Sequence, residues 1–183
     1  MVQIPQDTTE NSDAFKNGYK TIADIGKKRI SLAGEKIMSE NPIVARNMDL
    51  GFRVFKLSTS NMIDVYYSVD EYNQSMLSML ESNVKLDRTD IDILFGCLLE
   101  WGLPLSMPYT LEEIEGCTIH TYNNGDLVAC FNENIPDSVF NEIAKRYPLR
   151  AVFRDRSFEG SPAKINVSEI FKLLSPDTRV KVI

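Results

Sequence analysis

A cysteine and the single histidine, Cys117 and His120, are the residue types in this chain best suited to nucleophilic chemistry. A thiol and an imidazole act together only when they are adjacent and a third group orients the base. The run from Thr118 to Tyr122 predicts a strand, and residues three apart on a strand point to opposite faces. We therefore expect no catalytic role for this pair, and we interpret His120 as a surface or hydrogen-bonded histidine.

Three carboxylates, Glu112, Glu113 and Glu115, stand beside Gly116. Clustered carboxylates can bind magnesium or perform acid–base chemistry. These three fall in a polar connection between core elements, so a solvated loop is the favoured interpretation. The three cysteines include no Cys-x-x-Cys pair, and with one histidine they fall short of a zinc site of about four clustered ligands. We predict no catalytic and no metal-binding residues.

A basic group near the C-terminal end, Arg150, Arg154, Arg156 and Lys164, could meet phosphate or an acidic partner surface. Arg150 and Arg154 are four apart and share a strand face, whereas Arg156 falls in the following loop. The alternative for this group is a solvated sheet edge. Trp101 ends an apolar helix, which indicates a core or subunit-interface position and not a base-stacking one.

The charge of the chain is distributed unevenly. The net charge of −6 combines +1 over residues 1–46, −10 over residues 47–148 and +3 over residues 149–183. Phosphate binding requires Lys and Arg to displace condensed counterions. The acidic middle therefore argues against this chain as the main DNA-reading element.

Size and composition fit one domain, or one domain plus part of another. The chain has 183 residues, of which 43% are hydrophobic, enough to bury a core. No apolar run approaches the roughly 18 residues of a transmembrane helix, and the first residues do not resemble a signal peptide. Three cysteines, an odd number, indicate buried thiols in a reducing cytosol.

The first half of the chain predicts mainly helices. A short strand at Val2–Pro5 precedes a helix capped by Ser12 or Asp13. Thr21 and Asp24 form a capping-box pattern for a helix that ends near Asn41-Pro42. Further elements follow in the order strand 52–57, loop 58–67, a helix with apolar Tyr72, Met76, Met79 or Leu80, and Val84, and a helix that begins at Thr89 and is apolar on most faces.

From residue 118 the pattern predicts the order β-β-α-β-α-β. A hairpin joins strands 118–122 and 126–131 through Asn123-Asn124-Gly125. A helix after Pro136 has the inner face Val139, Phe140, Ile143, Ala144 and Tyr147. Strand 150–153, a helix capped by Asn166 with Glu169 and bearing Ile170, Phe171 and Leu174, and strand 178–182 complete the order. We expect an α/β fold of α+β character, with a mixed sheet, packed helices and a preceding N-terminal helical segment.

Four phrases along the chain carry a family resemblance: 18–30 (GYKTIADIGKKRI), 50–57 (LGFRVFKL), 149–155 (LRAVFRD) and 174–183 (LSPDTRVKVI). In this order they resemble the C-terminal part of the modification (Mod) subunit of type III restriction–modification systems. These subunits are S-adenosylmethionine-dependent DNA adenine methyltransferases of the bacterial cytoplasm. The family's catalytic Asp-Pro-Pro-Tyr motif and its Phe-x-Gly-x-Gly cofactor loop do not occur in these 183 residues.

The resemblance implies a division of the chain. Residues 1–45 match the edge of a methyltransferase core, and residues 50–183 match the Mod C-terminal domain, an assembly element. Gln3 matches the position where related enzymes place an acidic residue on the ribose of S-adenosylmethionine, and it is the one implied cofactor-binding residue. The resemblance implies no cofactor and no enzymatic activity for this fragment, with S-adenosylmethionine serving the parent enzyme.

Our leading hypothesis is a cytoplasmic protein-interaction module that joins Mod subunits, as in a homodimer, or docks the restriction (Res) subunit. The alternative is an accessory domain that contacts the DNA backbone through the basic helix 16–36 and the region 150–164. In either case we expect weak or no DNA binding by this fragment alone, and no membrane association.

Overall fold

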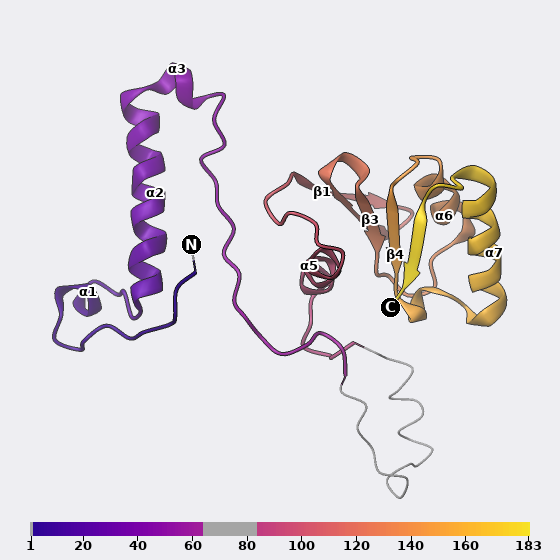
Figure 1. Cartoon of the computed structure of the whole chain (residues 1–183), viewed down its shortest axis with the longest axis horizontal. Coiled ribbons are helices and arrows are strands. Elements are labelled where there is room, and N and C mark those ends of the chain that lie inside the picture. The colour runs from indigo at the N-terminus through magenta and orange to yellow at the C-terminus, as the bar shows by residue number, and fades with distance from the viewer. Residues whose placement is uncertain (1, 64–83) are drawn as a thin grey trace, which may run out of the picture. The chain divides into compact units, whose positions relative to one another are not determined.

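A computed structural model describes residues 2–63 and 84–183 of the chain. Two compact units are present, Met1–Lys56 and Leu57–Ile183. The described residues form six α-helices and one five-stranded mixed sheet (Figure 1). This confirms the predicted mixed α/β class with an N-terminal helical part. The assignment of residues 1–45 and 50–183 to parts of a Mod subunit stays a prediction.

The first unit consists of three helices, α1 (Asp13–Lys16), α2 (Ile22–Glu40) and α3 (Pro42–Ala45). The capping box predicted for α2 is formed, because the Thr21 hydroxyl accepts from the Asp24 amide and the Asp24 carboxylate accepts from the Thr21 amide. The helix ends just before Pro42, as predicted. A Ser12 cap starts α1, where the Ser12 hydroxyl accepts from the Phe15 amide.

Little of the first unit is buried. No residue of α2 is buried, and its apolar residues Ile22 and Ile37 keep 38% and 36% of their surface exposed. The strands predicted at residues 2–5 and 52–57 are not formed. An alternating sequence becomes a strand only when a second strand supplies hydrogen bonds, and the described sheet does not include these two segments.

The second unit is organised around one sheet. Its strands are β1 (Tyr109–Ile114), β2 (Cys117–Tyr122), β3 (Leu127–Cys130), β4 (Arg150–Phe153) and β5 (Arg179–Val182). They lie side by side in chain order. The pairs β1–β2 and β2–β3 are antiparallel, and the pairs β3–β4 and β4–β5 are parallel. The predicted order β-β-α-β-α-β is confirmed, with one further strand in front of it.

That additional strand corrects the expected loop at the carboxylate cluster. Glu112 and Glu113 lie within β1, and Glu115 and Gly116 form the two-residue turn to β2. Both turn residues have positive φ, 49° and 77°, which suits the tight hairpins that match strand twist. Most of β1 is exposed on both faces, so its sequence lacks the apolar alternation that marks a half-buried strand.

Helices cover both faces of the sheet (Figure 1). Helices α6 (Asp137–Ala144) and α7 (Gly160–Leu174) pack on one face over a core that includes Ile119, Phe140 and Phe153. Helix α5 (Asp90–Glu100) packs on the other face over a core that includes Leu94, Leu98, Leu127 and Val152. We call these the α7 face and the α5 face.

The helix of the α5 face agrees with its prediction. Thr89 and Asp92 close a capping box at its start, and Ile93, Leu94, Cys97 and Leu98 are buried. The helix predicted to bear Tyr72, Met76, Met79 or Leu80 lies outside the described residues. Its last predicted residue, Val84, is buried and forms a β-bridge with Met62.

The α7 face requires two corrections. Helix α7 begins at Gly160, not at Asn166, whose side-chain amide instead donates to the Asp137 carboxylate of α6. Tyr147 does not belong to the inner face of α6, because that helix ends at Ala144 and Tyr147 is 70% exposed with φ of 52°.

None of the helices within residues 2–63 and 84–183 is long and apolar enough to cross a bilayer.

Candidate interaction surface

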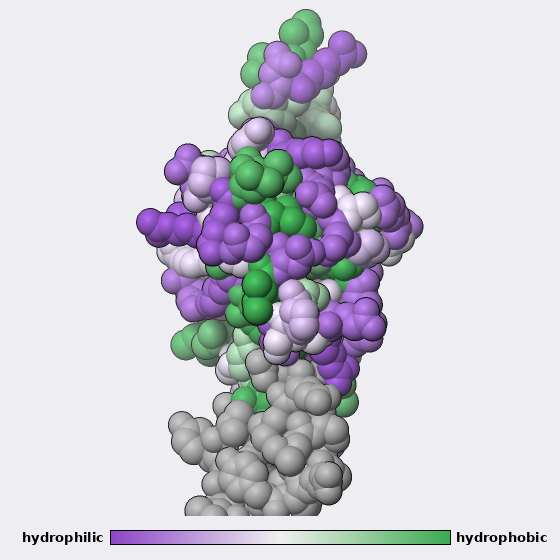
Figure 2. Space-filling model, turned by 90° about the vertical axis from the view of Figure 1, so that its right-hand side faces the viewer, coloured by the Kyte–Doolittle hydropathy of each residue, from purple (hydrophilic) through white to green (hydrophobic). Residues whose placement is uncertain are grey.

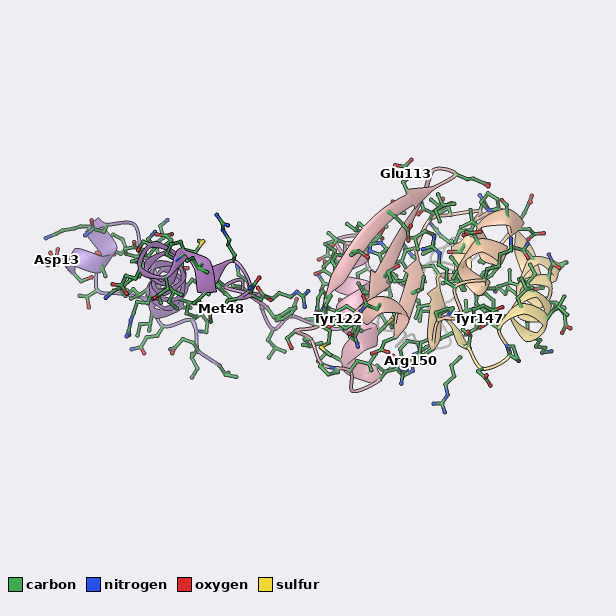
Figure 3. The ribbon with its side chains drawn as sticks, turned by 90° about the horizontal axis from the view of Figure 1, so that it is seen from above. Asp13, Met48, Glu113, Tyr122, Tyr147 and Arg150 are labelled. Atoms are coloured by element: carbon green, nitrogen blue, oxygen red, sulfur yellow. The ribbon has the colours of Figure 1, made fainter. Side chains whose placement is uncertain are left out.

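Basic side chains gather at the start of β4 and β5 on the α5 face. Arg150 and Arg179 open the two strands and are register partners. Val152 belongs to the core under α5, so Arg150, two residues earlier, lies on the same face. Lys181 pairs with Val152 in the register and therefore shares this face. Figure 3 labels Arg150 near Tyr122 at one end of the strands, with Glu113 at the other.

Trp101 joins this group at the C-terminal end of α5. Its ring centroid lies 5.7 Å from the Arg150 guanidinium carbon and 5.8 Å from the Lys181 ammonium. Cations at such distances over an indole ring are attracted to it by about 0.5–1 kcal/mol at exposed sites. The Lys181 ammonium also lies 2.5 Å from the Glu100 carboxylate. We call Trp101, Arg150, Arg179 and Lys181 the basic cluster.

The arginines of this face differ from others in the unit in their ionic contacts. Arg88 pairs with Asp87, and Arg146 pairs with Glu112. By contrast, no carboxylate of the described residues forms an ion pair with the three arginines of the α5 face, Arg150, Arg154 and Arg179. A guanidinium carries five N–H donors in a fork that fits carboxylate or phosphate. These arginines therefore keep donors available for an anionic partner.

The basic group predicted from the sequence is only partly brought together. Arg154 follows β4 and lies at the opposite end of that strand from Arg150. Arg156 lies in a short 3₁₀ turn and pairs with Glu133 at 3.3 Å, and Lys164 pairs with Asp155 at 2.5 Å. Sequence reasoning missed Arg179 and Lys181, although the β-α-β pattern from 150 to 182 already favoured β5 as a parallel neighbour of β4.

Cys117 and His120 are separated, as predicted. Cys117 lies in the core of the α7 face, whereas His120 is buried on the α5 face beside Phe131. The His120 Nδ1 lies 2.8 Å from the Tyr109 hydroxyl. Its Nε2 has no hydrogen-bond partner among the described residues and lies 3.7 Å from the Asp90 carboxylate. The histidine is therefore buried and half-satisfied, not a surface residue.

Burial makes the sulfur chemistry of the chain unreactive. Desolvation raises the pKa of the Cys97 thiol to about 11 and that of the Cys130 thiol to about 12, and it also raises the pKa of Cys117. Only a thiolate is a nucleophile or metal ligand. The three thiols are therefore protonated and inert at neutral pH.

The carboxylates of the β1 hairpin make structural contacts. Glu112 pairs with Arg146, and the Glu115 carboxylate accepts from the Ser138 hydroxyl at 2.6 Å, so both tie the hairpin to the α6 region. Beside them an open surface groove of about 690 Å³ is lined by Ile114, Glu115, Ser138, Asn141, Glu142, Lys145 and Leu174. The described part of the chain contains no group of three or more His, Cys, Asp or Glu residues that could hold a metal ion.

Gln3 is exposed and lies in a segment of the first unit without regular secondary structure. Its side-chain amide donates to the neighbouring Ile4 carbonyl at 3.1 Å. The role of Gln3 in cofactor binding stays a prediction.

No protein-family model matches the chain. A stretch of 59 residues is 41% identical to the Mod subunit of the type III restriction–modification enzyme StyLTI from Salmonella typhimurium strain LT2. The match covers 32% of this chain and 9% of the length of that subunit. The chain is therefore similar, over part of its length, to a small part of a type III modification subunit.

Proposed function

We propose that the chain is the C-terminal region of a type III Mod subunit and serves as an assembly module in the bacterial cytoplasm. Its partners are other Mod subunits and the restriction subunit. The observation that carries this proposal is the 59-residue stretch that is 41% identical to such a subunit. The parent enzyme methylates adenine with S-adenosylmethionine, whereas these 183 residues contain neither the Asp-Pro-Pro-Tyr nor the Phe-x-Gly-x-Gly motif.

The charge and packing of the second unit support an assembly role. Residues 57–183 carry 11 basic and 19 acidic side chains, which disfavours a polyanion such as DNA. The sheet packs against a hydrophobic core on each face, so it can hold the side chains of a contact surface in fixed positions. Aromatic residues and arginine, both present in the basic cluster, are enriched at protein interfaces.

The α7 side offers less for such a contact. Viewed from that side, the surface is mainly hydrophilic with separate hydrophobic patches (Figure 2). On α7 itself, Ile165 and Leu173 are 66% and 82% exposed, with the ion-paired Glu169 and Lys172 on the same helix. The α5 face, whose arginines form no ion pair with the described carboxylates, is the stronger candidate for contact.

A second candidate function is contact with the DNA backbone. It is favoured by Arg150, Arg154 and Arg179, which have no ion pair with the described carboxylates. The basic helix α2 supports it less, because Lys27 pairs with Asp24 at 2.7 Å and Lys36 with Glu40 at 3.7 Å. Both candidates use cations of the α5 face and differ in the partner.

A binding experiment with a salt series tests the proposal. The purified chain should bind purified Mod or Res subunits, and should bind duplex DNA weakly. The double variant Arg150→Ala/Arg179→Ala should weaken subunit binding, while Lys172→Ala serves as a matched control on the other face. Tight duplex binding that falls steeply with salt, with no binding to either subunit, would favour DNA contact instead.

A further inference from the structure

The outer edge of β5 has no neighbouring strand among the described residues, because β5 is the last in the sheet order. The Arg179 amide donates to the Leu149 carbonyl at 3.0 Å, and the Ile183 amide donates to the Phe153 carbonyl at 2.9 Å. These odd-numbered residues therefore bond towards β4. Backbone groups alternate in direction along a strand that pairs on one side, so Val180 and Val182 direct their N–H and C=O groups to the open edge.

The side chains of β5 alternate in chemistry as well. Arg179 and Lys181 lie on the α5 face, within the basic cluster. Val180 and Val182 lie on the α7 face and are 37% and 39% exposed. An exposed edge strand is open to pairing with another chain, and Lys on such an edge is a common protection against it. The same positive charges disfavour a basic strand and favour an acidic one.

We propose that the edge of β5 binds an extended acidic segment of a partner protein, which adds to the sheet as a further strand. Backbone hydrogen bonds to Val180 and Val182 hold the segment. Its carboxylates alternate onto Arg179, Lys181 and the adjacent Arg150, and its apolar residues lie over the two valines. This is the mode of recognition in which main-chain bonds give affinity and alternate side chains give specificity.

This inference rests on the proposed assembly function, for which it names the contact surface and the chemistry of the partner. An acidic peptide fits better than a nucleic acid for two reasons. A phosphate chain lacks the alternating donors and acceptors that an open strand edge requires. The excess of acidic residues over residues 57–183 also repels a long polyanion, whereas a short segment meets only the local positive charge.

Trp101 provides the readout, since it is the single tryptophan of the chain and belongs to the basic cluster. The probe is a blocked hexapeptide of alternating glutamate and valine, and its control alternates lysine and valine. We expect the acidic peptide to change the Trp101 emission saturably and the basic peptide to leave it unchanged. Arg179→Glu should lower the affinity for the acidic peptide by about tenfold, whereas Lys172→Glu should leave that affinity unchanged.

The backbone part of the proposal is tested separately. Val182→Pro removes an N–H that faces the open edge, a position where a sheet tolerates proline. Binding should be lost while circular dichroism stays unchanged, and Val182→Ala should still bind. Hydrogen exchange on the unmodified chain gives the same test without a variant. The acidic peptide should slow exchange of the Val180 and Val182 amides and leave the Arg179 amide unaffected.

Two results would overturn the inference. One is the absence of any emission change or amide protection with the acidic peptide at millimolar concentration. The other is stronger binding of a single-stranded oligonucleotide to the basic cluster without protection of Val180 and Val182. Because these measurements use no Mod or Res subunit, their failure is distinguishable from failure of the proposed assembly function.

Discussion

His120 makes a single buried polar contact that contributes to the stability of this sheet. Its Nδ1 depends on the Tyr109 hydroxyl at 2.8 Å, and its Nε2 has no hydrogen-bond partner among the described residues. Tyr109→Phe should lower the free energy of unfolding by about 1–2 kcal/mol, because it leaves a second buried nitrogen without a partner. Tyr147→Phe, at a residue 70% exposed, is the matched control and should change stability by less than about 0.5 kcal/mol.

Urea unfolding monitored by circular dichroism measures both variants. Equal stability of Tyr109→Phe and the unmodified chain would show that the hydroxyl contact contributes nothing.

The buried thiols give a prediction with a defined pH dependence. Burial raises the pKa of Cys97 to about 11 and of Cys130 to about 12, so both stay protonated in the folded chain well above the ordinary value of 9.0. Iodoacetamide should leave the native chain unmodified at pH 8 and modify all three cysteines in urea.

The same shifts link these thiols to stability at alkaline pH. Because burial penalises the thiolate, these shifts leave stability unchanged below pH 9 and lower it as pH rises from 9 towards 12, where the unfolded thiols lose protons that the folded thiols retain. Mass spectrometry after alkylation provides the first measurement, and unfolding at a series of pH values provides the second. Rapid modification of the native chain at pH 8 would contradict the account.

The limits of sequence reasoning at the residue scale lie in long-range pairing. Alternation along the chain places Arg150 and Arg154 on one face, and the structure agrees. The local sequence does not predict that Arg156 forms an ion pair with Glu133, 23 positions earlier. It also does not predict that Arg179 lies beside Arg150 in the strand register. A sequence shows which residues share a face of one strand, but the neighbours across strands depend on the whole sheet.

At the scale of elements, short capping patterns are the most predictable feature. Thr89 and Asp92 start α5 with a reciprocal pair of hydrogen bonds. Thr89→Ala should lower the free energy of unfolding by about 1 kcal/mol, a typical cost for the loss of an N-cap. Thr110→Ala, at an exposed position of β1, is the control with a smaller expected effect.

The cap also has a pH signature. Hydrogen bonds from Thr89 lower the pKa of Asp92 below its usual 3.8. Its contribution is therefore present above pH 3.8 and is lost as pH falls below that value. The difference in stability between Thr89→Ala and the unmodified chain should shrink in this acid range. A constant difference from pH 7 to pH 2 would contradict the assignment of the cap.

Strands are less predictable than caps because pairing decides them. The segments 2–5 and 52–57 alternate like strands, yet neither forms one in the described structure. Conversely, β1 carries two glutamates and is mostly exposed, yet six backbone register pairs with β2 make it a strand. Helix α7 begins at Gly160, six residues before the predicted Asn166, and its start has no side-chain cap that the sequence could reveal.

For the whole molecule, burial predicts a large difference in stability between the two units. Four residues of α5 are buried, whereas α2 has none. Amide exchange should be slowest at residues 91–99 and much faster at residues 14–37, since local opening is easiest where few apolar contacts are made. Hydrogen exchange followed by mass spectrometry measures this. Equal protection of the two segments in a monomer would contradict it.

We propose that the region from residue 50 to 183 assembles the subunits of a type III enzyme. The most direct measurement is light scattering on the full-length Mod subunit, with and without the segment equivalent to residues 50–183, mixed with the restriction subunit. We predict that the deletion abolishes the complex, while methylation of the recognised DNA site is retained as the control for folding. Intact assembly in the deletion, with only the affinity for DNA reduced, would contradict the account.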